Sequence, residues 1–167
     1  MVKVGIIGCG KIAQVRHAPE YLANPDCKII ATYDRMPERA ADLARRCGAK
    51  AYDSVEGLLA SGVDAVSVCV HNVAHAETSI QALRAGAHVL CEKPMATTLQ
   101  DCEEMARVAR ETGRTLMIGH NQRYSQTHHM ARDLIREGAI GTPIAFRLAF
   151  CHPGPEEWTG LSHSWFF

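Results

Sequence analysis

The chain has 167 residues, of which 47% are apolar, and this is enough for one domain of ordinary size with a proper core. Its 18 basic and 18 acidic side chains cancel, so no overall charge favours nucleic acid or an anionic membrane as a partner. No apolar run is long enough to span a membrane. Seven cysteines without a Cys-x-x-Cys pair favour reduced thiols in a cytoplasmic protein over a disulfide framework.

Short apolar runs alternate with amphipathic stretches through the first two thirds of the chain. The expected strands are 2–7, 28–33, 49–52, 65–70, 89–91 and 115–118, and the expected helices are 12–22, 37–47, 54–60, 75–85 and 99–111. Ser54 and Thr98 stand where helix N-caps are expected. Strands that alternate with helices through short connections predict an α/β fold with a doubly wound, mostly parallel sheet.

The pattern changes beyond the last of these strands. A helix is expected over 128–137, and residues 143–150 alternate like one strand. A Pro-Gly-Pro run over 153–155 and four aromatic residues follow, namely Trp158, Trp165, Phe166 and Phe167. We therefore expect a first domain over 1–120, and over 121–167 a hinge helix, a first strand and the incomplete start of a second, α+β domain.

A Gly-x-Gly-x-x-Ala turn over residues 8–13 directly follows the first strand. Gly8 permits a tight strand-to-helix turn, Gly10 lets the backbone approach a pyrophosphate, and Ala13 lets the helix pack closely on the strand. The free N–H groups and the dipole at the start of this helix, where Lys11 and Ile12 lie, favour a phosphate group. The turn therefore predicts a phosphate-binding site.

Asp34 ends the second strand, 21 residues after Ala13, where its carboxylate can accept hydrogen bonds from both hydroxyls of an adenosine ribose. It should repel a 2′-phosphate, which favours NAD, whereas the guanidinium of Arg35 could pair with that phosphate. In the alternative interpretation the glycines serve only a turn and Asp34 caps the next helix. An S-adenosylmethionine enzyme also uses a similar turn. We predict a Rossmann domain that binds NAD, with NADP possible.

The segment Glu92-Lys93-Pro94 follows the apolar run 88–91, at the end of a later strand of the same sheet. Lys93 thus places a cation where the reactive end of a bound dinucleotide would lie. An ammonium group there can polarise a carbonyl or stabilise a developing alkoxide during hydride transfer. Lys93 is therefore the candidate catalytic residue, and the alternative is a solvated charge at a strand end.

Several spaced motifs together resemble the Gfo/Idh/MocA oxidoreductases. They are the glycine turn 8–13, the strand end 70–72 with His75, the segment 92–94, the segment 119–124 and the helix end 134–141. The resemblance spans the whole chain. It implies oxidation or reduction of carbohydrates, polyols and related hydroxy or keto compounds with NAD or NADP, in a protein expected to be a homo-oligomer.

The resemblance also implies roles for individual residues. Lys93 would contact the substrate hydroxyl and the nicotinamide ribose, and its bond to Pro94 would be cis. The implied cofactor contacts are Val70, Asn72, His75, Glu92, Lys93, Asn121 and Arg123. Glu92 is expected to orient its turn rather than to transfer protons. Asn72 could instead cap the following helix, and Asn121 and Arg123 could instead form a polar hinge.

The family's usual catalytic aspartate and histidine come from the second domain, and nothing like that pair follows Phe167. The chain alone is therefore expected to be inactive, as the N-terminal part of a dehydrogenase. Two alternatives are a stand-alone nucleotide-binding module without turnover and one half of an assembly whose catalytic half is another chain. The spacing of the histidines does not suit a metal site, and His17 is interpreted as a packing or surface residue of the first helix.

Overall fold

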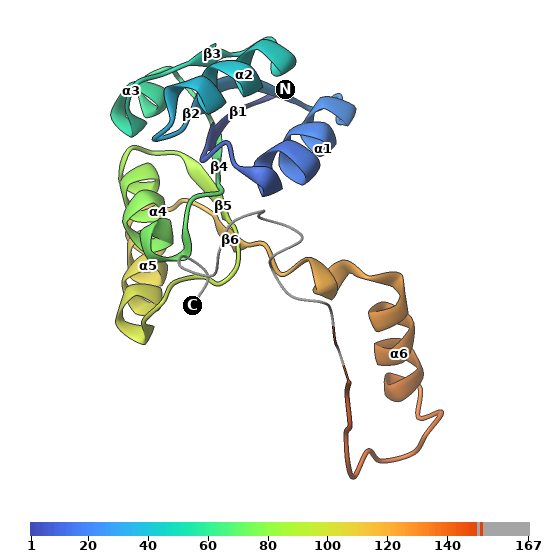
Figure 1. Ribbon diagram of the computed structural model, residues 1–167. Helices are drawn as coiled ribbons and strands as arrows, with labels where there is room; N and C mark the ends of the chain where they lie inside the picture. Colours follow the sequence, from blue (N-terminus) through green and yellow to red (C-terminus); the bar gives the residue numbers. More distant parts are fainter. Residues whose placement is uncertain (150, 152–167) are drawn as a thin grey trace. The chain divides into compact units, whose positions relative to one another are not determined.

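The computed structural model describes residues 1–149 and 151. Six parallel strands form one sheet in the order β3-β2-β1-β4-β5-β6 (Figure 1). The strands are β1 (Val2–Ile7), β2 (Cys27–Tyr33), β3 (Lys50–Ala51), β4 (Ala65–Val68), β5 (His88–Cys91) and β6 (Leu116–Ile118). The chain builds outward from β1 to β3 and then crosses to β4, so the strand order reverses between β1 and β4. The predicted doubly wound Rossmann sheet is confirmed.

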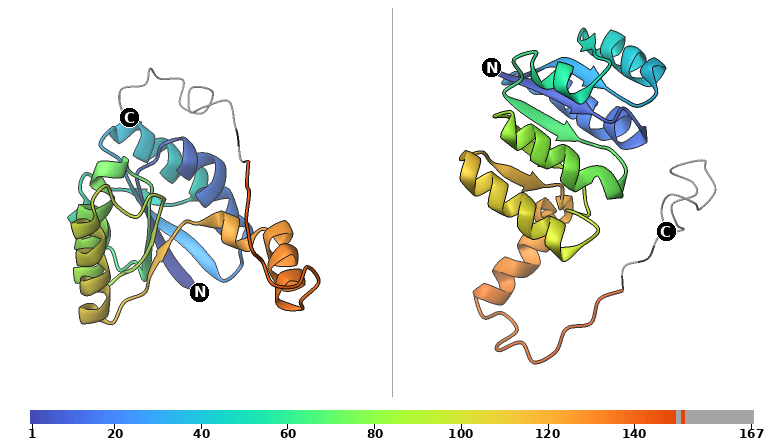
Figure 2. Two further views of the ribbon diagram at one scale, coloured as in Figure 1. Left: turned by 90° about the horizontal axis from the view of Figure 1, so that it is seen from below. Right: turned by 90° about the vertical axis from the view of Figure 1, so that its left-hand side faces the viewer.

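Helices cover both faces of the sheet, and each face has its own apolar core. On one face α1 (Ala18–Ala23) and α2 (Pro37–Cys47) pack with Ile6. On the other, α3 (Val55–Leu59), α4 (His75–Arg84) and α5 (Leu99–Thr112) pack with Ile7. Neighbouring residues of a strand point to opposite faces, so β1 contributes to both cores. Figure 2 shows α4 and α5 lying side by side over the sheet.

The predicted caps are confirmed in the structure. The Ser54 side chain accepts a hydrogen bond from the Gly57 amide, and the Thr98 side chain accepts one from the Asp101 amide. The helix expected over 12–22 is present, but its first part, η1 (Ala13–His17), is a π-helix that continues directly into α1. The amide of residue 18 bonds the carbonyl five residues earlier, which is the π-helical pattern.

The structure divides into a compact unit of Met1–Gly119 and a second unit that begins at His120. The second unit contains η3 (Asn121–Tyr124) and α6 (Gln126–Arg136), which confirms the predicted helix with an earlier start. Three apolar residues of α6, namely Met130, Leu134 and Ile135, are exposed.

The strand predicted over 143–150 was wrong over 143–149, which have no strand assignment. A strand requires a hydrogen-bonding neighbour, and none of residues 1–149 provides one there. Residue 150 and the predicted aromatic tail lie outside the described residues. Among the described helices, none combines the length and the apolar character that a membrane span requires.

Candidate cofactor and active site

The register of the sheet brings the predicted site residues to one edge. Tyr33, Ile7, Val68, Cys91 and Ile118 stand opposite one another as the last residues of their strands. One residue farther on, four amides continue the hydrogen-bond ladder, with N···O distances of 2.8–2.9 Å; they belong to Gly8, Cys69, Glu92 and Gly119. Asp34 directly follows Tyr33 at the same edge. The glycine turn, the acidic residue and the turn of Lys93 therefore follow one carboxyl edge, where doubly wound sheets bind their ligands.

The glycine turn has the geometry that a dinucleotide requires. Gly8 has a φ of +91°, and a Cβ atom on it would lie 2.5 Å from the carbonyl oxygen of Cys69. Apart from Gly10 itself and its two chain neighbours, no residue has a heavy atom within 4 Å of the place where a Cβ of Gly10 would stand. The first glycine is thus required by the fold, whereas the second leaves open space beside the backbone. Exposed Lys11 and half-buried Ile12 follow at the helix start. These features fit a pyrophosphate at the turn.

Asp34 ties the end of β2 to the glycine turn. Its Oδ2 accepts a hydrogen bond from the Cys9 amide at 2.7 Å, and its Oδ1 accepts one from the Met36 amide at 2.8 Å. The N-cap of α2 is Met36, and no side chain caps this helix, so Asp34 is not its cap. An ionised carboxylate has about four lone-pair sites, so it can still accept ribose hydroxyls. Arg35 beside it is exposed.

Lys93 lies exposed just beyond β5, in a turn held by the residue before it. Its bond to Pro94 is cis, as predicted. The Lys93 amide donates to Oε2 of Glu92 at 3.1 Å. Burial raises the pKa of Glu92, but the hydrogen bond and charge of His17, with the amide and charge of Lys93, outweigh it, so this pKa lies below its usual value. Glu92 is therefore an ionised anchor of the turn, in agreement with its expected orienting role.

His75 contacts the same turn through the backbone carbonyl of Pro94. Its side chain is 1% exposed, with Nδ1 2.6 Å from the carbonyl oxygen of Pro94 and Nε2 3.1 Å from that of Val70. The ring therefore lies between two backbone segments of the carboxyl edge, and in its neutral form it donates to one of the two carbonyls. A direct contact between this ring and the cofactor stays a prediction.

Three further predicted residues lie in short helices. Asn72 begins η2 (Asn72–Ala74), and neither η2 nor α4 has a side-chain cap, so its alternative role as a cap is not observed. Asn121 and Arg123 lie exposed in η3 of the second unit. Their contact with the cofactor and their alternative role as a hinge stay predictions. Within the described part of the chain, no three histidine, cysteine or acidic residues come together as a metal site.

The structure also places His17 in the site, which the sequence analysis missed. It is 8% exposed, and its Nε2 lies 2.9 Å from Oε1 of Glu92. Its Nδ1 lies 3.1 Å from the hydroxyl of Ser67, which is 2.7 Å from the hydroxyl of Tyr21. The interpretation of His17 as a packing or surface residue was thus incomplete. Its position one turn beyond the glycine motif was the available signal.

The cysteines nearest this edge are poor nucleophiles. Cys9, Cys69 and Cys91 are buried. Burial, followed by the charge of Asp34, raises the pKa of Cys9 to about 12, although the hydrogen bond to the Tyr33 carbonyl opposes the shift. Burial likewise raises the pKa of Cys91 to about 11. Because the thiolate is the reactive form, these thiols have a packing role.

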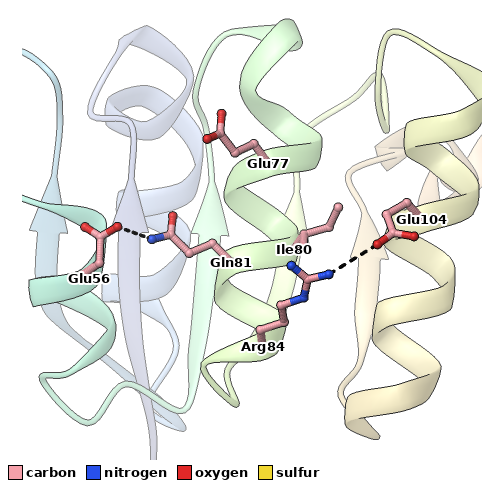
Figure 3. A pocket seen from close by; sticks show the side chains of 6 residues that line it. All are labelled: Glu56, Glu77, Ile80, Gln81, Arg84 and Glu104. Atoms are coloured by element: carbon pink, nitrogen blue, oxygen red, sulfur yellow. Dashed lines mark hydrogen bonds and ion pairs between the residues drawn. The ribbon is translucent and has the colours of Figure 1, made fainter.

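A separate hollow lies on the outer surface of the helices α3, α4 and α5. Figure 3 shows two pairs of its polar side chains, Glu56 with Gln81 and Arg84 with Glu104. It lies on the solvent side of the helix layer rather than at the carboxyl ends of the strands. The hollow is therefore not part of the candidate cofactor site.

Comparison with known proteins agrees with this geometry. Residues 2–120 match Gfo/Idh/MocA, described as an oxidoreductase family with an NAD-binding Rossmann fold. The chain belongs to this family, as the motifs predicted, and it contains the family's NAD(P)-binding domain.

Relatives of known activity cover most of the chain. It is 41% identical over 150 residues to 1,5-anhydro-D-fructose reductase from Ensifer adhaerens, a match over 89% of this chain and 45% of that protein. It is 36% identical over 142 residues to D-glucoside 3-dehydrogenase from Escherichia coli, a match over 84% of this chain and 40% of that protein. A 3-ketoreductase from Actinomadura kijaniata, solved with NADP and TDP-benzene, superimposes with a TM-score of 0.77 at 38% identity. The match covers 82% of this chain and 42% of that protein. The chain thus spans less than half the length of these relatives.

Proposed function

We propose that this chain is the cofactor-binding part of an NAD(P)-dependent enzyme that transfers a hydride between nicotinamide and a sugar, polyol or related hydroxy or keto compound. The observation that carries the proposal is the alignment of the glycine turn, Asp34 and the turn of Lys93 along one carboxyl edge. The names of the relatives, reductases and a dehydrogenase of sugar compounds, support the substrate class.

In this proposal each residue has a separate task. Gly8, Gly10 and the start of the helix hold the pyrophosphate, and Asp34 accepts hydrogen bonds from the adenosine ribose. The nicotinamide supplies or accepts the hydride. The ammonium group of Lys93 donates hydrogen bonds to the substrate oxygen, where it stabilises negative charge that develops during the transfer. Asn72, which follows β4 in the same unit, contacts the nicotinamide end of the cofactor.

We propose NAD as the preferred cofactor, because the carboxylate of Asp34 repels a 2′-phosphate. Arg35, exposed beside it, is the residue that would favour NADP. The relative from Actinomadura kijaniata was solved with NADP, so related sites can hold the phosphate. A Kd for NADPH equal to or lower than that for NADH would contradict the preference.

The test is Lys93→Ala in a full-length enzyme that carries this sequence. We expect turnover to fall by roughly 100-fold or more, since an electrostatic donor at the reacting oxygen typically contributes that much. The Kd for NADH, measured by fluorescence titration, should stay within about twofold of the wild-type value. Lys3→Ala, at the opposite end of the sheet, is the control and should change neither quantity.

Unchanged turnover in Lys93→Ala would overturn the proposed role of this lysine. The alternative is a nucleotide-binding module without turnover. It predicts tight NADH binding and no oxidation of any polyol, even when a downstream domain is supplied, so restored activity would exclude it.

A further inference from the structure

We propose that His17 is a positioning residue for Lys93, acting through the carboxylate of Glu92 from the helix that follows the glycine turn. The inference deepens the proposed function and rests on it, because the position of Lys93 affects catalysis only if this lysine meets the substrate. The contacts that carry the inference lie within residues 1–119.

The carboxylate of Glu92 connects the two residues. Its Oε1 lies 2.9 Å from Nε2 of His17, and its Oε2 accepts the Lys93 amide at 3.1 Å. One oxygen is thus held by the imidazole ring, and the other holds the backbone at the start of the Lys93 turn. Rotation of the carboxylate would break both contacts together. The ring therefore restricts the peptide that carries Lys93.

The surroundings of Glu92 leave little freedom for that carboxylate. The side chain of Glu92 is 17% exposed and that of His17 is 8% exposed. A Cβ atom on Gly119 would lie 3.3 Å from Oε1 of Glu92, so the glycine at the end of β6 provides space that a larger residue would fill. Hydrogen bonds in such a shielded place are stronger than in water, and an unpaired partner is costly.

The ring of His17 is itself oriented by a hydrogen bond at its other nitrogen, Nδ1. Its Nδ1 lies 3.1 Å from the hydroxyl of Ser67, a residue of β4 that is fully buried, and this hydroxyl lies 2.7 Å from that of Tyr21. Burial raises the pKa of Tyr21, although its hydrogen bond to Ser67 opposes this, so the tyrosine remains a hydroxyl donor.

The carboxylate of Glu92 fixes the donor on one side of the ring. A carboxylate oxygen only accepts, so Nε2–H of His17 donates to Glu92; Nδ1 accepts from the Ser67 hydroxyl when the ring is neutral and donates to it when the ring is protonated. The opposite tautomer would place a bare ring nitrogen against a carboxylate oxygen. The geometry therefore assigns the hydrogen of the ring to Nε2.

This arrangement links the cofactor turn to the candidate catalytic lysine. His17 ends the π-helical stretch that begins at Ala13, directly after the glycine turn. The start of this helix is where the cofactor phosphates are expected, and its next turn holds Glu92. The two ends of the site are thus connected through one helix and one carboxylate, and Lys93 should be oriented before a substrate arrives.

The test compares His17→Gln with His17→Asn in this chain, by NMR. A glutamine amide can replace the Nε2 donor to Glu92, whereas an asparagine reaches only to Ser67. We expect His17→Asn to raise the pKa of Glu92 and to move the Lys93 amide signal, because the lowering contact is lost. We expect His17→Gln to keep both near their wild-type values. In a full-length enzyme, His17→Asn should lower kcat by roughly 10- to 100-fold with little change in the KM for NADH.

The inference is overturned if folded His17→Asn keeps the wild-type Glu92 pKa and Lys93 amide signal, or if kcat is unchanged. If the asparagine variant does not fold, the nitrogen signals of His17 in the wild-type chain decide: hydrogen on Nε2, in the neutral or the protonated ring, supports the contact with Glu92, and hydrogen on Nδ1 alone overturns it. NADH binding to the wild-type chain is measured in parallel. A failure to bind would count against the proposed function, while the Glu92 and Lys93 signals still test whether His17 positions Lys93 through Glu92.

Discussion

At the scale of single residues, the two glycines of the cofactor turn are needed for different reasons. Gly8 has a positive φ, and its missing side chain avoids the backbone of Cys69. Gly10 has no such backbone angle, and the space beside it is open. The first glycine therefore serves the fold, and the second serves the ligand.

This difference predicts opposite outcomes for two alanine substitutions. Gly8→Ala should lower the free energy of unfolding by at least about 1–3 kcal/mol, the usual cost of a strained backbone, before the clash with Cys69 is added. Gly10→Ala should leave stability within about 0.5 kcal/mol but weaken NADH binding, because its Cβ occupies the space for the pyrophosphate. Urea denaturation and NADH titration measure the two effects. Equal stability losses would contradict this assignment.

At the scale of elements, the N-terminus of α5 follows directly from its sequence. The Thr98 hydroxyl accepts the Asp101 amide at 3.1 Å and donates to the Asp101 carboxylate at 2.7 Å. Farther along, Arg107 pairs with Glu104 and Glu111, but all three are at least one third exposed, and such pairs contribute little. The cap, rather than the ion pairs, is thus the main local source of stability in this helix.

Thr98→Ala should therefore destabilise the protein by about 1 kcal/mol, within the usual range of about 0.5–2 kcal/mol for a lost N-cap. Thr97→Ala, at the exposed position just before the cap, is the matched control and should have almost no effect. Equilibrium urea denaturation measures both changes. If the two variants were equally stable, the cap would not be the stabilising feature.

At the scale of the whole molecule, one half-buried carboxylate joins elements that are distant in sequence. Glu92 follows β5 and bonds His17, 75 residues earlier. Its pKa is lowered in the folded state because the contacts with His17 and Lys93 outweigh burial. The stabilisation that this provides is fully present above the pKa of an unfolded glutamate, about 4.3. It is lost as the pH falls through the lower folded value.

As the pH falls below about 5, the free energy of unfolding should therefore decrease more steeply for the wild-type chain than for the Glu92→Gln variant. The measurement is the urea midpoint as a function of pH. Glu104→Gln is the control, because the pKa of Glu104 is also lowered, mainly by its bond from Arg107, but at a solvent-screened site. The urea midpoint of Glu104→Gln should follow the wild-type curve more closely than that of Glu92→Gln does. Identical slopes for all three proteins would refute the role of Glu92.

The two units of the chain differ in how far they could be predicted. In the first unit, alternating apolar runs and caps such as Ser54 are local signals, and the strands and helices follow from them. The predicted strand at 143–150 failed over its described part because alternation shows only that a segment could pair. Whether a segment does pair depends on a neighbouring backbone that the local sequence does not contain.

The sequence by itself determined the order of the elements, the glycine turn and the positions of Asp34 and Lys93 at strand ends. These follow from short-range spacing, because parallel strands bring their carboxyl ends to one edge. Only the tertiary structure decided which distant groups meet there. The pairing of His17 with Glu92, and of His75 with the Pro94 carbonyl, depends on how two helices pack against the sheet, and helical periodicity predicts the face of a residue but not its partner.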